Sequence, residues 1–153
     1  MTSRLSEAIR EGFRAAVGSA GASVSPVELR ARARDLSLTR PERDAVIRSA
    51  VIAYQQGDRQ LWAPVILELL APAIMHLRLR FGVVPPVILD EDIGQELLAE
   101  VLRAAIRLRV DESSLYVERR IILRATTRLM RWLAKEGRVR NWKSGPLIEG
   151  EGQ

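Results

Sequence analysis

Residues 115–136 read LYVERRIILRATTRLMRWLAKE, and this stretch decides the fold class of the chain. Apolar side chains recur in it at the spacing of an α-helix, without the strict alternation that is typical of a strand. The apolar seam consists of Leu115, Ile122, Leu129 and Leu133 and is widened by Ile121, Ala125 and Trp132. The pattern predicts a helix from about residue 115 to 136 that buries one face against its neighbours.

Another face of this predicted helix is strongly basic. Basic residues recur on it at spacings of four, four, three and four positions: Arg120, Arg124, Arg128, Arg131 and Lys135. We call these five residues the basic stripe. Successive members rise by about 5–6 Å along a helix, close to the separation of phosphates along a nucleic-acid strand. The stripe predicts weak, salt-dependent binding of nucleic acid. Two alternatives stay open, namely a solvated surface or ion pairs with the preceding helix.

The preceding segment, residues 90–109, has the periodicity of a second amphipathic helix. Its predicted core positions are Ile93, Leu97, Val101, Ala104 and Leu108. A different face carries charged residues, namely Asp92, Glu96, Glu100 and Arg103. Carboxylates near a helix start interact favourably with the helix dipole, so the simplest interpretation of this face is a capped, solvated surface.

Helix signals also dominate the first half of the chain. Apolar periodicity and start signals predict helices over residues 3–17, 26–35, 39–56 and 58–80. Ser25 and Thr39 each precede a glutamate three positions later, which is a capping box. Pro64 and Pro72 should kink or divide the last of these helices, because proline has no amide hydrogen. We therefore expect an all-α fold, a bundle of five to six helices, with loops at residues 18–23 and 82–89 and a polar tail from Gly137.

The composition fits one folded domain. Of the 153 residues, 47% are hydrophobic and 28% are charged, which favours a folded chain over a disordered one. The absence of cysteine excludes a disulfide framework and a thiolate metal site. The most apolar run, residues 61–77, is shorter than a membrane span requires and contains a glutamate and two prolines. We therefore expect a soluble, cytoplasmic protein with no membrane partner.

Charge is distributed unevenly along the chain, whose formal net charge is +5. Residues 58–112 carry 6 basic and 9 acidic side chains, whereas residues 113–153 carry 9 basic and 4 acidic ones. The middle of the chain is therefore acidic and its end is basic, and a basic end suits an anionic partner.

Residues that carry enzyme chemistry are scarce. His76 is the single histidine, and its place in an apolar run predicts a partly buried side chain and not a catalytic base. The sequence has no histidine cluster for a transition metal and no glycine-rich phosphate loop. We therefore expect a binding protein that is not an enzyme, with no cofactor and no metal.

Several short motifs follow one another between residues 57 and 138. Gly57-Asp58 precedes an apolar helix that contains Ala71-Pro72, and a loop follows that helix. The block Glu91-Asp92-Ile93-Gly94-Gln95-Glu96 comes next, with Arg103 after it and the arginine-rich helix at the end. In this order the motifs resemble the second conserved region of bacterial RNA polymerase sigma factors, in the short form of the extracytoplasmic-function group.

The resemblance implies two binding faces. In the family, the helix with the acidic block docks on the clamp helices of core RNA polymerase, which would place Asp92, Gln95 and Glu96 against polymerase. The following helix recognises and opens promoter DNA, which would be the role of the basic stripe. The resemblance thus implies a sigma-like transcription factor or regulator, with RNA polymerase core and DNA as partners.

Two departures from the family pattern leave an alternative open. The usual Trp-Leu and Asn of the DNA-binding helix have no aligned counterpart, since Tyr116 and Trp132 are its only aromatic residues and Asn141 lies beyond its expected end. We also expect no counterpart of the family's C-terminal helix-turn-helix domain. The expected order is an N-terminal helical extension over residues 1–56, a region-2-like domain over 57–138 and a flexible tail over 139–153. The alternative is a helical interaction or scaffold module that binds neither DNA nor polymerase.

Overall fold

The computed structural model describes the backbone of residues 2–18, 26–81 and 90–144, with side chains for residues 4–15, 27–81 and 90–136. Within these ranges the chain forms seven α-helices and no strand. They are α1 (Thr2–Gly18), α2 (Pro26–Ala33), α3 (Arg40–Gln56), α4 (Arg59–Leu69), α5 (Ala71–Phe81), α6 (Asp90–Arg107) and α7 (Val117–Ser144). The predicted all-α fold is confirmed. The helices outnumber the predicted five to six because the segment around residue 70 is divided.

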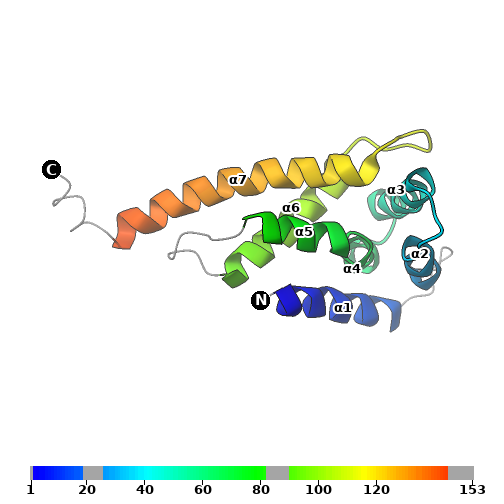
Figure 1. Ribbon diagram of the computed structural model, residues 1–153, viewed down its shortest axis with the longest axis horizontal. Helices are drawn as coiled ribbons and strands as arrows, with labels where there is room; N and C mark the ends of the chain where they lie inside the picture. Colours follow the sequence, from blue (N-terminus) through cyan, green and yellow to red (C-terminus); the bar gives the residue numbers. More distant parts are fainter. Residues whose placement is uncertain (1, 19–25, 82–89, 145–153) are drawn as a thin grey trace.

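The helices share one hydrophobic core. α7 lies along one side of the molecule and α1 along the opposite side, with α4, α5 and α6 between them (Figure 1). α6 packs against α7, while α1 packs against α4 and α5. Buried apolar side chains from all seven helices join a single cluster. The core therefore continues across residue 57, and the first three helices pack as one body with the last four.

Two predicted helix starts have their capping side chains in place. Thr39 Oγ1 accepts a hydrogen bond from the amide of Glu42 at 3.3 Å, and its hydroxyl donates to Glu42 Oε1 at 3.0 Å. The Asp58 carboxylate accepts from the amides of Gln60 and Leu61 at 3.0 and 3.3 Å. These amides have no partner inside the helix, so the caps fix where α3 and α4 begin.

The apolar segment between residues 59 and 81 divides at Leu70, and α4 and α5 meet at an angle of 64°. Pro72 is the second residue of α5, where its missing amide hydrogen costs no helical hydrogen bond. Pro64 lies inside α4. Among the described helices, none alone is long and apolar enough to cross a membrane, and only the bent pair α4 and α5 passes that criterion of length and composition.

The predicted end of the last helix is wrong. Gly137 was expected to begin the tail, but the backbone stays helical through Ser144. A glycine inside a helix costs only about 1 kcal/mol relative to alanine, which a helix of this length tolerates. Residues 19–25, 82–89 and 145–153, which include most of the predicted linker, the Ser25 cap, the predicted loop and the end of the tail, lie outside the described residues.

A buried ion cluster joins α1, α2 and α4. The side chain of Glu68 on α4 is only 1% exposed, and its Oε1 lies 2.9 Å from Arg30 Nε and 2.5 Å from Arg34 Nη2. The Arg30 guanidinium also stacks over the Phe13 ring of α1, 4.8 Å from its centroid. The two arginines neutralise a carboxylate that could not otherwise be buried.

Candidate functional site

α7 is anchored on the core by residues four positions apart. Val117, Ile121, Ala125 and Leu129 are buried, and Ile122, Trp132 and Leu133 are partly buried beside them. The predicted seam is confirmed with two corrections, of which the first is that the fully buried Val117 was left out of it. Leu115 precedes the helix and is 62% exposed, so it is not part of the seam.

The connection from α6 to α7 is a tight turn. The Asp111 carboxylate accepts hydrogen bonds from the Ser113 hydroxyl at 2.6 Å and from the Ser113 amide at 2.8 Å. Donation by the Ser113 hydroxyl is the main reason why the pKa of Asp111 lies below its ordinary value. Tyr116 follows with a φ of 56°, a left-handed conformation that is costly for a residue with a side chain.

Helix α3 holds the start of α7 in place. The Asp44 carboxylate accepts a hydrogen bond from the Glu118 amide at 3.3 Å, and thus caps α7 from another helix. Arg48 donates to the Ser114 carbonyl at 2.8 Å. Arg43 lies 3.5 Å from the Glu118 carboxylate. These contacts on both sides of Tyr116 maintain its left-handed backbone, with a side chain that is 68% exposed.

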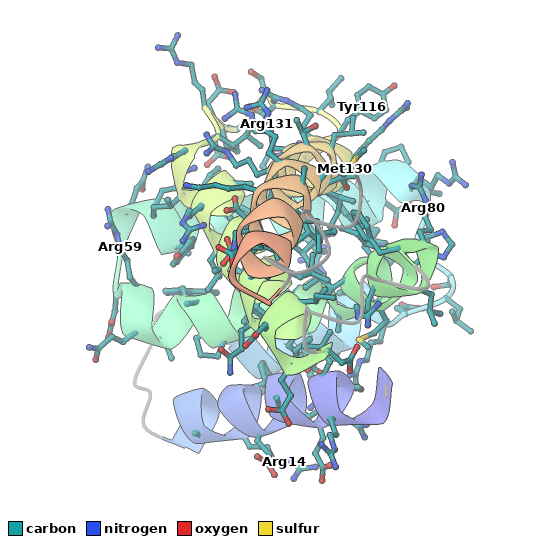
Figure 2. All side chains as sticks on the ribbon, turned by 90° about the vertical axis from the view of Figure 1, so that its left-hand side faces the viewer. Arg14, Arg59, Arg80, Tyr116, Met130 and Arg131 are labelled. Atoms are coloured by element: carbon teal, nitrogen blue, oxygen red, sulfur yellow. The ribbon has the colours of Figure 1, made fainter. Side chains whose placement is uncertain are left out.

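The basic stripe faces solvent. Arg124, Arg128, Arg131 and Lys135 are exposed and Arg120 is half-buried, and Figure 2 shows Arg131 on the outer side of α7, away from α1. Among the ion pairs of the described residues, none involves a member of the stripe. Arginines on other helices do pair with carboxylates, namely Arg4, Arg30, Arg34, Arg43, Arg78 and Arg103. The stripe is thus a row of cations left available to an external anion.

Two carboxylates of α6, those of Glu96 and Glu100, have a partner within their own helix. Arg103 Nη1 lies 3.2 Å from Glu96 Oε1 and also pairs with Glu100. The hydrogen bond to Glu96, with the charge of Glu100 as the next cause, raises the pKa of Arg103 above its ordinary value. The sequence placed Glu100 on a solvated face, but this residue is only 5% exposed. It is buried because Arg103 neutralises it, so Glu96 and Glu100 do not pair with the stripe.

The three residues that the resemblance assigns to polymerase lie in the first half of α6. Gln95 is exposed, whereas Asp92 and Glu96 are half-buried. Glu96 is held by Arg103, and Asp90 at the helix start pairs with Arg78 of α5. Of the three, Gln95 is therefore the side chain that α6 presents most openly.

The structure also locates the side chains that bear on enzyme chemistry. His76 is exposed on α5 and not partly buried, because the apolar residues of this helix that enter the core are its neighbours Ile74 and Leu77. Within the described residues, no three histidine, aspartate or glutamate side chains gather where they could hold a metal ion.

The sequence interpretation missed a set of exposed apolar side chains on α7. Leu123 is 56% and Met130 57% exposed, seven residues apart, and the exposed Tyr116 directly precedes the helix. The signal was present in the sequence as this spacing, but these residues lie off the seam and were left without a role.

Comparisons of the chain with models of protein families, with curated proteins and with solved structures found no match.

Proposed function

We propose that this chain is a sigma-like transcription factor or regulator that binds nucleic-acid phosphates through the basic stripe and RNA polymerase core through α6. One observation carries the nucleic-acid half. The five cations of the stripe follow one another along α7, and none is engaged by a carboxylate in the described part of the chain. Leaving so many like charges side by side is unfavourable unless an anion neutralises them.

The geometry of α7 fits a phosphate backbone. From Arg120 to Lys135 the helix rises by about 22 Å, which spans several phosphates of one strand. Arginine can bind a phosphate through two nitrogens at once, which favours it over lysine for this contact. Such contacts position a protein on nucleic acid and do not distinguish bases, so the binding is weak, salt-dependent and nearly independent of sequence.

The polymerase half rests on the resemblance and on the position of the acidic block. Asp92, Gln95 and Glu96 lie on α6, which packs directly against α7. One rigid pair of helices would therefore present both faces at a fixed distance, as a factor that holds DNA against polymerase requires.

A specific observation also favours the second candidate, a helical protein–protein interaction module. Glu96 already pairs with Arg103, so its carboxylate is less available for a contact with polymerase. The exposed Leu123 and Met130 are in turn more typical of a protein interface than of a DNA-binding face.

A pull-down with core RNA polymerase at low salt separates the two candidates. The wild-type chain is expected to bind, and the variant with Asp92→Ala, Gln95→Ala and Glu96→Ala to bind at least about tenfold more weakly. The matched control is Glu7→Ala with Glu11→Ala, which removes two exposed carboxylates from the neighbouring helix α1. Absence of wild-type binding, or equal losses in both variants, would reject polymerase as the partner of α6.

A further inference from the structure

The outer side of α7 carries a line of apolar side chains that no other described helix covers. Tyr116, Leu123 and Met130 are each more than half exposed. Leu123 and Met130 are seven residues apart, a spacing that returns to nearly the same side of a helix, and Tyr116 directly precedes α7. Figure 2 shows Tyr116 and Met130 on the side of α7 that also carries Arg131, away from α1. These residues are therefore a continuous feature of the surface and not isolated exceptions.

Together with the residues between them, they form the pattern of a coiled-coil seam. Positions 120, 123, 127, 130 and 134 of α7 follow one another in steps of three and four, as a coiled-coil seam requires, and Arg120 of the basic stripe is the one charged residue among them. The large Leu123 and Met130 alternate with the small Thr127 and Ala134, both exposed. Large side chains beside small ones provide the knobs and the holes of helix packing. We call these five positions the α7 seam; it is about 21 Å long.

The charges beside the α7 seam determine what can pack on it. In this register Arg124 and Arg131 flank the seam on one side and Arg119 on the other, and all three are exposed. Flanking positions of a coiled coil lie opposite those of the partner helix and select its charge. A second copy of α7 would place arginine against arginine, whereas a helix flanked by glutamate or aspartate would form pairs on both sides.

We propose that the α7 seam is the docking site of an acidic amphipathic helix from another protein. The apolar face of that helix covers Leu123 and Met130, and its flanking carboxylates pair with Arg119, Arg124 and Arg131. Docking of a helix stands apart from the proposed function. One consequence rests on that function: because Arg124 and Arg131 also belong to the basic stripe, the docked helix and nucleic acid exclude one another.

The test uses a designed helical peptide as the probe, with leucine at its seam positions and glutamate at its flanking positions. Mutual repulsion of the glutamates keeps the peptide from pairing with itself. Fluorescence anisotropy of the labelled peptide measures its affinity for the full chain. The variant with Leu123→Gln and Met130→Gln is expected to bind at least about tenfold more weakly, as loss of two central apolar contacts does in protein interfaces. The matched control Leu79→Gln changes an equally exposed leucine on α5 and should bind as the wild type does.

Four results would overturn the proposal. The first is equal binding by the wild type and the Leu123→Gln, Met130→Gln variant. The second is equal binding of a peptide whose leucines are replaced by glutamine, since attraction would then be charge alone. The third is a concentration-dependent dimer that this variant abolishes, which would make a second copy the occupant. The fourth is binding to phosphatidylglycerol vesicles that depends on Leu123 and Met130, without peptide binding, which would identify a lipid surface.

The same variants distinguish failure of this inference from failure of the proposed function. Replacing Leu123 and Met130 should leave DNA affinity within about twofold of the wild type, because the phosphate-binding charges remain. Peptide binding without any DNA binding by the wild type would reject the nucleic-acid role and leave the docking site standing. DNA binding without peptide binding that depends on the α7 seam would reject the docking site and leave the nucleic-acid role standing.

Discussion

In the buried ion cluster around Glu68, substitutions of the cations and of the anion should have unequal effects on the free energy of unfolding. Replacing Arg30 and Arg34 by methionine should be far more damaging than replacing Glu68 by methionine. The carboxylate is 1% exposed, whereas the two arginine side chains are 30% and 57% exposed. Without the two arginines, the negative charge of Glu68 stays buried and unpaired. Without Glu68, the two arginine side chains can turn toward water.

The magnitudes follow from this difference in exposure. A buried charge that has lost its partners costs about 3–5 kcal/mol. For a domain of this size that loss should lower the melting temperature by about 10 °C. The Glu68→Met variant should stay within about 1 kcal/mol of the wild type, because methionine fills the space and needs no partner.

Urea unfolding monitored by circular dichroism measures these free energies. The triple variant, with Glu68, Arg30 and Arg34 all replaced by methionine, is the control and should recover most of the stability lost by the arginine double variant. If Glu68→Met destabilises the fold as much as the double variant does, the cluster contributes net attraction and the reasoning from desolvation is wrong.

Three further predictions concern α7 and its start. Leu129→Asp should abolish cooperative unfolding, because it buries an unpaired carboxylate; a stable variant would show that Leu129 does not belong to the core. Tyr116→Val should cost about 1–2 kcal/mol more in urea unfolding than Tyr116→Gly, since only glycine adopts a left-handed φ freely; equal costs would contradict the strain at this position. Asp111 has a folded-state pKa below its ordinary 3.8, so its contribution is present above that pH and is lost as the pH falls through the folded pKa. In an NMR titration Ser113→Ala should raise the pKa of Asp111, and an unchanged pKa would show that the hydroxyl is not the cause.

Local patterns were sufficient where the stabilising contacts are local. The five predicted core positions of α6 are all buried, because periodicity alone decides which face of an amphipathic helix enters the core. The cap at Thr39 lies within three residues of the amide that it satisfies, so the sequence was enough to place it.

Contacts between distant residues could not be predicted in this way. The cap of α7 is the carboxylate of Asp44, which accepts a hydrogen bond from the amide of Glu118, 74 positions later. The local sequence pattern could not reveal this cap, so it started the helix too early and included Leu115. The burial of Glu68 depends on Arg34, 34 positions away. Charged residues are usually exposed, and only the folded arrangement identifies the exceptions.

The sequence could predict which residues form the basic stripe, but not whether carboxylates of the same chain already pair with them. The spacing of the basic stripe gave its residues, yet the same spacing fitted an alternative in which the arginines pair with Glu96 and Glu100. That choice depends on Arg103, which engages both carboxylates from within α6. The exposed α7 seam was also present in the sequence, but its exposure became clear only once the buried face of α7 was known.

The salt dependence of DNA binding tests the central claim most directly. Arg124→Gln with Arg128→Gln is compared with the wild type and with Arg14→Gln plus Arg59→Gln, which removes the same charge from exposed positions on other faces (Figure 2). Binding of labelled duplex DNA is measured by anisotropy over a range of salt concentrations. The stripe variant should keep its melting temperature, and the slope of log K against log [salt] should fall by about 2, while the control keeps the wild-type slope. Equal slopes for all three proteins, or a stripe variant that loses stability while the DNA binding of its folded fraction is unchanged, would contradict the assignment of α7 as a nucleic-acid-binding helix.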